Sequence, residues 1–329
     1  MKTPSAKSIN IIEKQYYNTK VKMMSPNWCT IAPVKYKDPH RYLKVPFSLA
    51  DGVVLDAIPT WLITDKFLSG LTFVQRDFII HAKYAMSVLY NAKNFRAPDE
   101  GWKGSETRSI QDAKKELLTL ANIAIWLAKP CAFGFDVVFH VDEFETDKDF
   151  CSAESLRDIE PHLKYEKTYL QSSDLSVAKE LHKIILELNR DSDVWTSIYF
   201  LWNALRETEW AVRYTLFWIA LEALFGPEDG EISFRISQRI GFLLGNTRSE
   251  ASDIFTKARE LYKWRSKVVH GRRLSKLVNN DDEAIRISFE SEMLLRDSLV
   301  KILESPTLVQ NFSTNREKFL DSLAFSGTQ

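Results

Sequence analysis

Residues 233–271, "SFRISQRIGFLLGNTRSEASDIFTKARELYKWRSKVVHG", carry the clearest helix signals in the chain. Thr247 and Glu250 have the T-x-x-E spacing of a capping box, which marks the start of a helix. Gly271 stands where a glycine in the left-handed conformation commonly ends a helix, so the pattern predicts a helix over residues 248–270. The sequence "LLGNT" before it supplies a turn. This stretch therefore predicts two helices in succession.

Apolar residues at helical spacing continue on both sides of this stretch, and strand-like alternation ends before residue 191. The expected helices cover residues 194–226, either unbroken or broken near Arg206 to Thr208, then 233–245, 248–270 and 282–304. The "DSD" of residues 191–193 supplies helix-capping side chains at a domain boundary. We therefore expect an all-α domain over residues 191–329.

The first 190 residues show a mixed pattern and predict an α+β domain of unknown role. Strands are expected within "VPFSLADGVVLDA" (45–57) and "FGFDVVFHVDEF" (133–144). Helices are expected within "QRDFIIHAKYAMSVLYNAK" (75–93), "IQDAKKELLTLANIAIWLAK" (110–129) and "SVAKELHKIILELNR" (176–190). Residues 1–44 are polar, with prolines at Pro26, Pro33 and Pro39 among them, so they predict an irregular arm that wraps the body or adds an edge strand.

The composition is that of a folded globular protein without a strong overall charge. The 329 residues are 45% hydrophobic and 12% aromatic, and 44 basic residues balance 44 acidic ones. Three cysteines, an odd number, fit neither a disulfide framework nor a zinc site; they are Cys29, Cys131 and Cys151. There is no signal-peptide pattern at the N-terminus and no apolar run that could span a bilayer, so we expect a cytoplasmic protein without membrane contact.

Arg265 and His270 are the candidate chemical residues of the 248–270 helix. Arg265 falls on the apolar stripe of this helix, which also includes Ile254, Ala258, Leu261 and Val268. An arginine on a buried stripe needs a carboxylate partner or an anion, and Glu222 is the candidate partner. His270 lies at the helix C-terminus, where the helix dipole favours the imidazolium form and a proton-transfer role near neutral pH.

The surroundings of this pair are basic. Between Ser233 and Lys276 the chain has eleven lysines and arginines against three carboxylates, an excess of eight positive charges. Such a region would attract a polyanion, although a solvated basic face explains the same composition.

Three sequences, "ALEALFG", "SFRISQRIGFLLG" and "ELYKWRSKVVHG", together resemble the Apea-like branch of the HEPN superfamily over residues 195–305. The resemblance implies a compact helical bundle that pairs as a homodimer. It also implies a metal-independent endoribonuclease without a cofactor, whose R-x4-6-H motif is completed at the dimer interface. Arg265 and His270 would be the catalytic residues, with Ser266 and Glu222 in support. Lys267, Arg272 and Arg273 are the expected RNA contacts, because they flank this pair.

The resemblance further implies a toxin or phage-defence setting, in which the front domain senses a trigger of phage origin or an antitoxin restrains the enzyme. Ser266 departs from the longer polar residue that often follows the motif's arginine in active members. This departure favours the alternative hypothesis, a non-catalytic HEPN dimer that binds nucleotide or RNA.

Two further features have simpler explanations than a functional site. The acidic stretch "HVDEFETDKD" (140–149) has metal-ligating residue types but no known ligand spacing, so we interpret it as a strand that leads into a solvated turn. The aromatic side chains from Trp195 to Trp218 follow helical spacing. We interpret them as bundle core and dimer face and not as a base-stacking platform.

Overall fold

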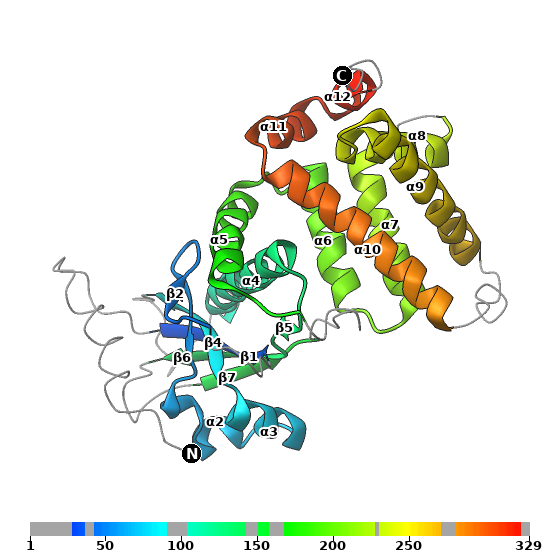
Figure 1. Cartoon of the computed structure of the whole chain (residues 1–329). Coiled ribbons are helices and arrows are strands. Elements are labelled where there is room, and N and C mark those ends of the chain that lie inside the picture. The colour runs from blue at the N-terminus through cyan, green and yellow to red at the C-terminus, as the bar shows by residue number, and fades with distance from the viewer. Residues whose placement is uncertain are drawn as a thin grey trace. The chain divides into compact units, whose positions relative to one another are not determined.

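The computed structural model describes residues 28–36, 43–90, 104–142, 151–157, 168–227, 230–270 and 281–323. These residues form two compact units, and helices predominate (Figure 1). The first unit comprises the described residues within Met1–Thr119 and Phe135–Leu156, and the second those within Leu120–Gly134 and Arg157–Gln329. An antiparallel sheet early in the chain followed by a helical region agrees with the expected α+β and all-α order.

The first unit is built on an antiparallel sheet. Its strands are β1 (Trp28–Tyr36), β2 (Phe47–Ser48), β3 (Val53–Ala57), β4 (Tyr84–Tyr90), β6 (Val137–Asp142) and β7 (Cys151–Ser155), and the two-residue β5 (Phe133–Gly134) ends at the unit boundary. The order β2-β3-β4-β1-β6-β7 places β1 in the interior. On one face, Ile31 and Phe139 pack with residues of α2 (Asp65–Leu68) and α3 (Phe73–His81), which follow the 3-10 turn η1 (Thr60–Leu62). On the other face, Thr30 lies directly opposite His140.

Two predictions for this unit are wrong. We expected residues 1–44 to form an arm or an edge strand, but Trp28–Tyr36 form an interior strand of the sheet. We expected a helix over residues 75–93, but the helix ends at His81 and is followed by the strand β4. β1 is buried on both faces along most of its length, and β4 is buried on one face and partly buried on the other, so their sequences do not alternate between apolar and polar residues. A strand buried on both faces resembles a helix or loop in a pattern analysis, because the period of two is hidden.

The second unit is a helical bundle. Its helices are the C-terminal part of α4 (Gly104–Ala128), then α5 (Ser172–Glu187), α6 (Asp193–Leu205), α7 (Trp210–Phe225), α8 (Ile232–Leu244), α9 (Arg248–Val269), α10 (Asp281–Leu303), α11 (Pro306–Thr314) and α12 (Arg316–Leu323). Figure 1 shows α10 lying across the bundle, where it packs against α7, α8 and α9. The break near Arg206 is present, because α6 ends at Leu205.

The helical unit begins earlier in the chain than the predicted boundary at residue 191. Trp126 of α4 and Ile185 of α5 belong to the same apolar core as Trp218 of α7. The expected domain division therefore separates α4 and α5 from the bundle with which they pack.

The contact between α8 and α9 depends on a glycine. A Cβ atom at Gly241 would lie 2.6 Å from the backbone oxygen of Ala251, which is closer than real Cβ contacts allow. We predict that Gly241→Ala lowers the free energy of unfolding by about 2 kcal/mol, because the overpacking outweighs the better helix propensity of alanine. Urea unfolding followed by circular dichroism measures this change. Gly70→Ala is the control, since its Cβ would meet nothing within 4 Å. Equal stability of the two variants would contradict the close helix contact.

Candidate functional site

α9 positions the candidate residues, and its first turn is fixed by two hydrogen bonds. The Thr247 hydroxyl accepts the Glu250 N–H at 3.2 Å, as the capping pattern predicts. In a capping box the Glu250 carboxylate would accept the N–H of the N-cap residue, Thr247. Here it accepts the N–H of the preceding residue, Asn246, at 2.8 Å. The helix ends at Val269, with His270 as its C-cap residue.

Arg265 and Glu222 form the expected ion pair between α9 and α7. Nη2 of Arg265 donates to Oε2 of Glu222 at 2.9 Å, and Nε of Arg265 lies 2.8 Å from Oε1. The two side chains are only 21% and 24% exposed. One edge of the guanidinium therefore faces the carboxylate, which neutralises the charge on the apolar stripe and fixes the direction of the arginine.

Tyr262 completes this cluster, and the sequence analysis did not find it. Its hydroxyl donates to Oε1 of Glu222 at 3.1 Å, and the Arg265 guanidinium lies 5.6 Å from the centre of its ring. Trp218 contacts the same ring edge-on, with centroids 5.2 Å apart. Burial, followed by the charge of Glu222, raises the pKa of Tyr262 to about 12, so the hydroxyl keeps its proton and donates. Tyr262 precedes Arg265 by three residues on the same helix, and this spacing could have indicated that the two side chains are neighbours.

His270 does not join this cluster within one chain. Its backbone N–H donates to the Ser266 carbonyl at 3.1 Å, and its side chain is exposed at the end of α9. Five helical positions separate the side-chain directions of Arg265 and His270 by about 140°. Arg265 is turned towards Glu222 of α7, so the side chains of Arg265 and His270 do not meet at one point within the chain.

The remaining candidates flank the pair or fall outside the structure. Ser266 is half-buried beside Arg265. The Lys267 ammonium lies 4.1 Å from the centre of the Trp264 ring, where a cation–π contact holds it. Arg272 and Arg273, with Gly271, lie outside the described residues.

The acidic stretch that begins at His140 shows no metal site in the part that the structure describes. The residues after Asp142 lie outside the described ranges. His140 is buried, and its Nδ1 lies 2.9 Å from Oγ1 of Thr30. Across the described residues, no group of three or more histidine, cysteine, aspartate or glutamate side chains is placed to hold an ion.

The two cysteines whose side chains are described do not provide a nucleophile. Cys29 and Cys131 are buried free thiols. Burial raises the pKa of each to about 12, so both remain protonated near neutral pH.

Comparison with known proteins gives no relative: no family model matches the sequence, and no curated protein or solved structure matches it. Within the described ranges, no helix combines the length and apolar character needed to cross a bilayer.

Proposed function

We propose that this chain is a metal-independent endoribonuclease of the HEPN type that acts as a homodimer in the cytoplasm, in a toxin or phage-defence setting. The observation that carries the proposal is the arrangement at the end of α9. Arg265 is held by a carboxylate while His270 is exposed five residues later. This pairing supplies a fixed cation for a phosphate and an accessible imidazole for proton transfer, which are the two functions that RNA transesterification requires.

In this mechanism a ribose 2′-hydroxyl attacks the adjacent phosphorus, the bond from phosphorus to the 5′-oxygen breaks, and the products end in a 2′,3′-cyclic phosphate and a 5′-hydroxyl. His270 takes the proton of the attacking hydroxyl, and a second copy of His270 as imidazolium protonates the leaving oxygen. Arg265 stabilises the negative charge that develops on the phosphate oxygens. The Ser266 hydroxyl and the Lys267 ammonium add hydrogen-bond donors beside it.

The dimer is part of the proposal because the site is incomplete in one chain. A two-fold axis presents the same helix end from both subunits, so the arginine of one subunit can meet the histidine of the other. The resemblance of this region to HEPN sequences supports this arrangement.

The test is cleavage of mixed-sequence RNA by purified protein in excess EDTA. We expect the wild-type chain to cleave and Arg265→Ala to cleave at least about 100-fold more slowly, because one preorganised donor to a developing oxyanion is worth about that factor. Wild-type protein that neither cleaves RNA in the tube nor harms cells that express it would end the nuclease proposal.

A second candidate function is a non-catalytic HEPN dimer that binds RNA or nucleotide. Ser266 favours it, as does the ion pair with Glu222, because the guanidinium already has a partner without a substrate. Under this alternative, RNA binds to the wild-type chain but is recovered uncut after incubation without metal.

A further inference from the structure

A row of cations runs along the exposed side of α9. Arg259, Lys263 and Lys267 follow one another at intervals of four residues, so their side chains are neighbours on one side of the helix. Arg259 and Lys263 are exposed, and Lys267 is half-buried. We call these three residues the α9 row. At about 100° per residue, His270 points within about 20° of the direction of Arg259, so the row leads to the imidazole.

The chain does not neutralise the exposed charges of the α9 row. Glu260, next to Arg259 in sequence, lies 3.7 Å from Arg286 of α10. The Arg259 guanidinium lies over an aromatic ring, 5.9 Å from the centre of Phe255. Lys263 forms no ion pair with any residue that the structure describes. Like charges four residues apart destabilise a helix, so a bound anion would stabilise this part of α9.

The end of the row farthest from His270 carries exposed aromatic surface. Phe255 of α9 contacts Phe234 of α8 edge-on, with ring centroids 5.4 Å apart. Phe234 is 37% exposed, and Phe255 connects it to the Arg259 guanidinium. The exposed ring of Phe234 offers a face on which a base can stack beside this cation.

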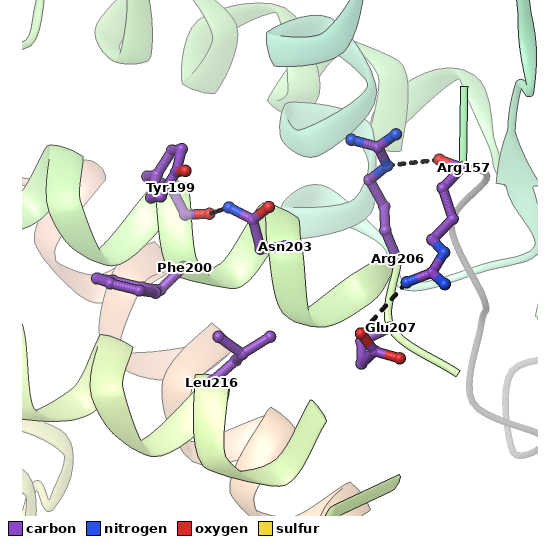
Figure 2. A pocket seen from close by; sticks show the side chains of 7 residues that line it. All are labelled: Arg157, Tyr199, Phe200, Asn203, Arg206, Glu207 and Leu216. Carbon is purple, nitrogen blue, oxygen red and sulfur yellow. Dashed lines mark hydrogen bonds and ion pairs between the residues drawn. The ribbon is translucent and has the colours of Figure 1, made fainter. Parts of the chain in front are cut away.

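The pocket at the turn between α6 and α7 differs from the α9 row in its charges (Figure 2). Nη1 of Arg157 donates to Glu207 at 3.2 Å, and Nε of Arg206 donates to the Arg157 carbonyl. The cations of the pocket are thus engaged by groups of the chain, whereas Arg259 and Lys263 face solvent. Of these two surfaces, the α9 row is the one that fits a polyanion.

We propose that the α9 row binds the backbone of a single-stranded RNA segment, with phosphates at its three cations and a base stacked on Phe234. Cations that follow the backbone, together with aromatic rings that accept bases, are the usual means of binding unpaired RNA. Arg259 and His270 are eleven positions apart. This is a rise of about 17 Å, which about five nucleotides span at a stacked spacing of about 3.4 Å. That the segment belongs to the RNA substrate rests on the proposed function, because the row leads to His270.

The experiment measures binding without cleavage. A fluorescein-labelled, unstructured RNA decamer with 2′-O-methyl riboses has no attacking hydroxyl, so the full-length wild-type protein cannot cut it by the proposed mechanism. Anisotropy in EDTA gives the affinity at salt concentrations from about 0.1 M to about 0.5 M. We expect Arg259→Gln with Lys263→Gln to reduce the slope of log affinity against log salt by about 1.4, since each phosphate contact to a single strand contributes about 0.7. This amounts to about 25-fold weaker binding at about 0.1 M salt if the affinities meet at about 1 M.

The stacking residue is tested in the same assay. Phe234→Ala is expected to weaken binding about tenfold without a change of slope, and Phe234→Tyr, which keeps the ring, to stay within about twofold of the wild type. Because Phe234, Arg259 and Lys263 are exposed, all these variants should show the circular dichroism of the wild type.

The matched control is Lys179→Gln with Lys183→Gln. These two lysines are also exposed and four residues apart, on α5 of the same helical unit, so the variant loses the same charge outside the row. It should bind the decamer with the wild-type slope.

Absent binding of the decamer by the wild type, an unchanged slope for the Arg259 and Lys263 variant, or equal losses in both double variants would each overturn the inference. Poly-glutamate is the second ligand. If it binds with this dependence on the row while the decamer does not bind, the row fits an acidic protein and the RNA assignment is wrong. Failure of the proposed function is distinguishable, because unmodified RNA would then stay uncut by the wild type while these binding differences persist.

Discussion

Replacing His270 with alanine is expected to slow RNA cleavage by about 10²- to 10⁴-fold, the usual contribution of a general acid–base group. The imidazole is exposed at the end of α9, and the described part of the chain shows it in no structural contact through its side chain. Its removal should therefore leave the fold and the Arg265–Glu222 pair unchanged. Initial rates on mixed-sequence RNA in EDTA measure the effect.

His81→Ala is the matched control for this variant. His81 is an exposed histidine at the end of α3, in the sheet unit, and has no part in the proposed chemistry. It should cleave at the wild-type rate. Equal rates for His270→Ala and His81→Ala would remove His270 from the mechanism.

The second large effect is expected in the stability of the sheet unit below neutral pH. His140 is 3% exposed, and its Nδ1 lies 2.9 Å from the Thr30 hydroxyl oxygen. Burial lowers the pKa of His140 from 6.5 to about 4, so the unfolded chain binds the proton more tightly than the folded one. The contribution of neutral His140 to the free energy of unfolding is fully present above pH 6.5 and is lost as the pH falls towards 4. The loss amounts to about 3 kcal/mol.

Urea unfolding of wild type and His140→Gln between pH 7 and pH 4 measures this loss. The wild-type chain should lose more stability over this interval, because glutamine has no proton to gain, whereas His81→Gln should follow the wild type. If His140→Gln does not fold, an NMR titration of the wild-type His140 ring gives the pKa directly. A pKa near 6.5, or parallel pH curves for wild type and His140→Gln, would show that the buried ring carries no such penalty.

The helices α6 to α10 could be predicted from the sequence within a residue at each end. Capping residues such as Thr247 and Ser192 and the apolar stripes of these helices are local signals, which survive in any tertiary context. The helices α11 and α12 were missed, although Ser305 and Pro306 have the residue types of a helix start. The interior strands β1 and β4 could not be recognised, because how far each face of a strand is buried depends on what packs against it.

In the candidate site, too, the features set by local sequence could be predicted and the features set by packing between helices could not. The Arg265–Glu222 pair followed from helical geometry, since an arginine on an apolar stripe requires a carboxylate. Tyr262 was missed because its role depends on how α9 lies against α7. Tyr199 is 56% exposed, and the sequence could not distinguish a core position from a dimer-face position there, because it does not show which side of α6 stays uncovered.

The chemical ends that the wild-type protein leaves on cleaved RNA in excess EDTA decide whether it is a metal-independent nuclease of the proposed kind. We expect 2′,3′-cyclic phosphate and 5′-hydroxyl ends, formed at a rate that added Mg²⁺ does not raise. Cleavage that requires Mg²⁺ and leaves 3′-hydroxyl and 5′-phosphate ends would contradict this expectation, because a histidine and an arginine without metal cannot account for those products.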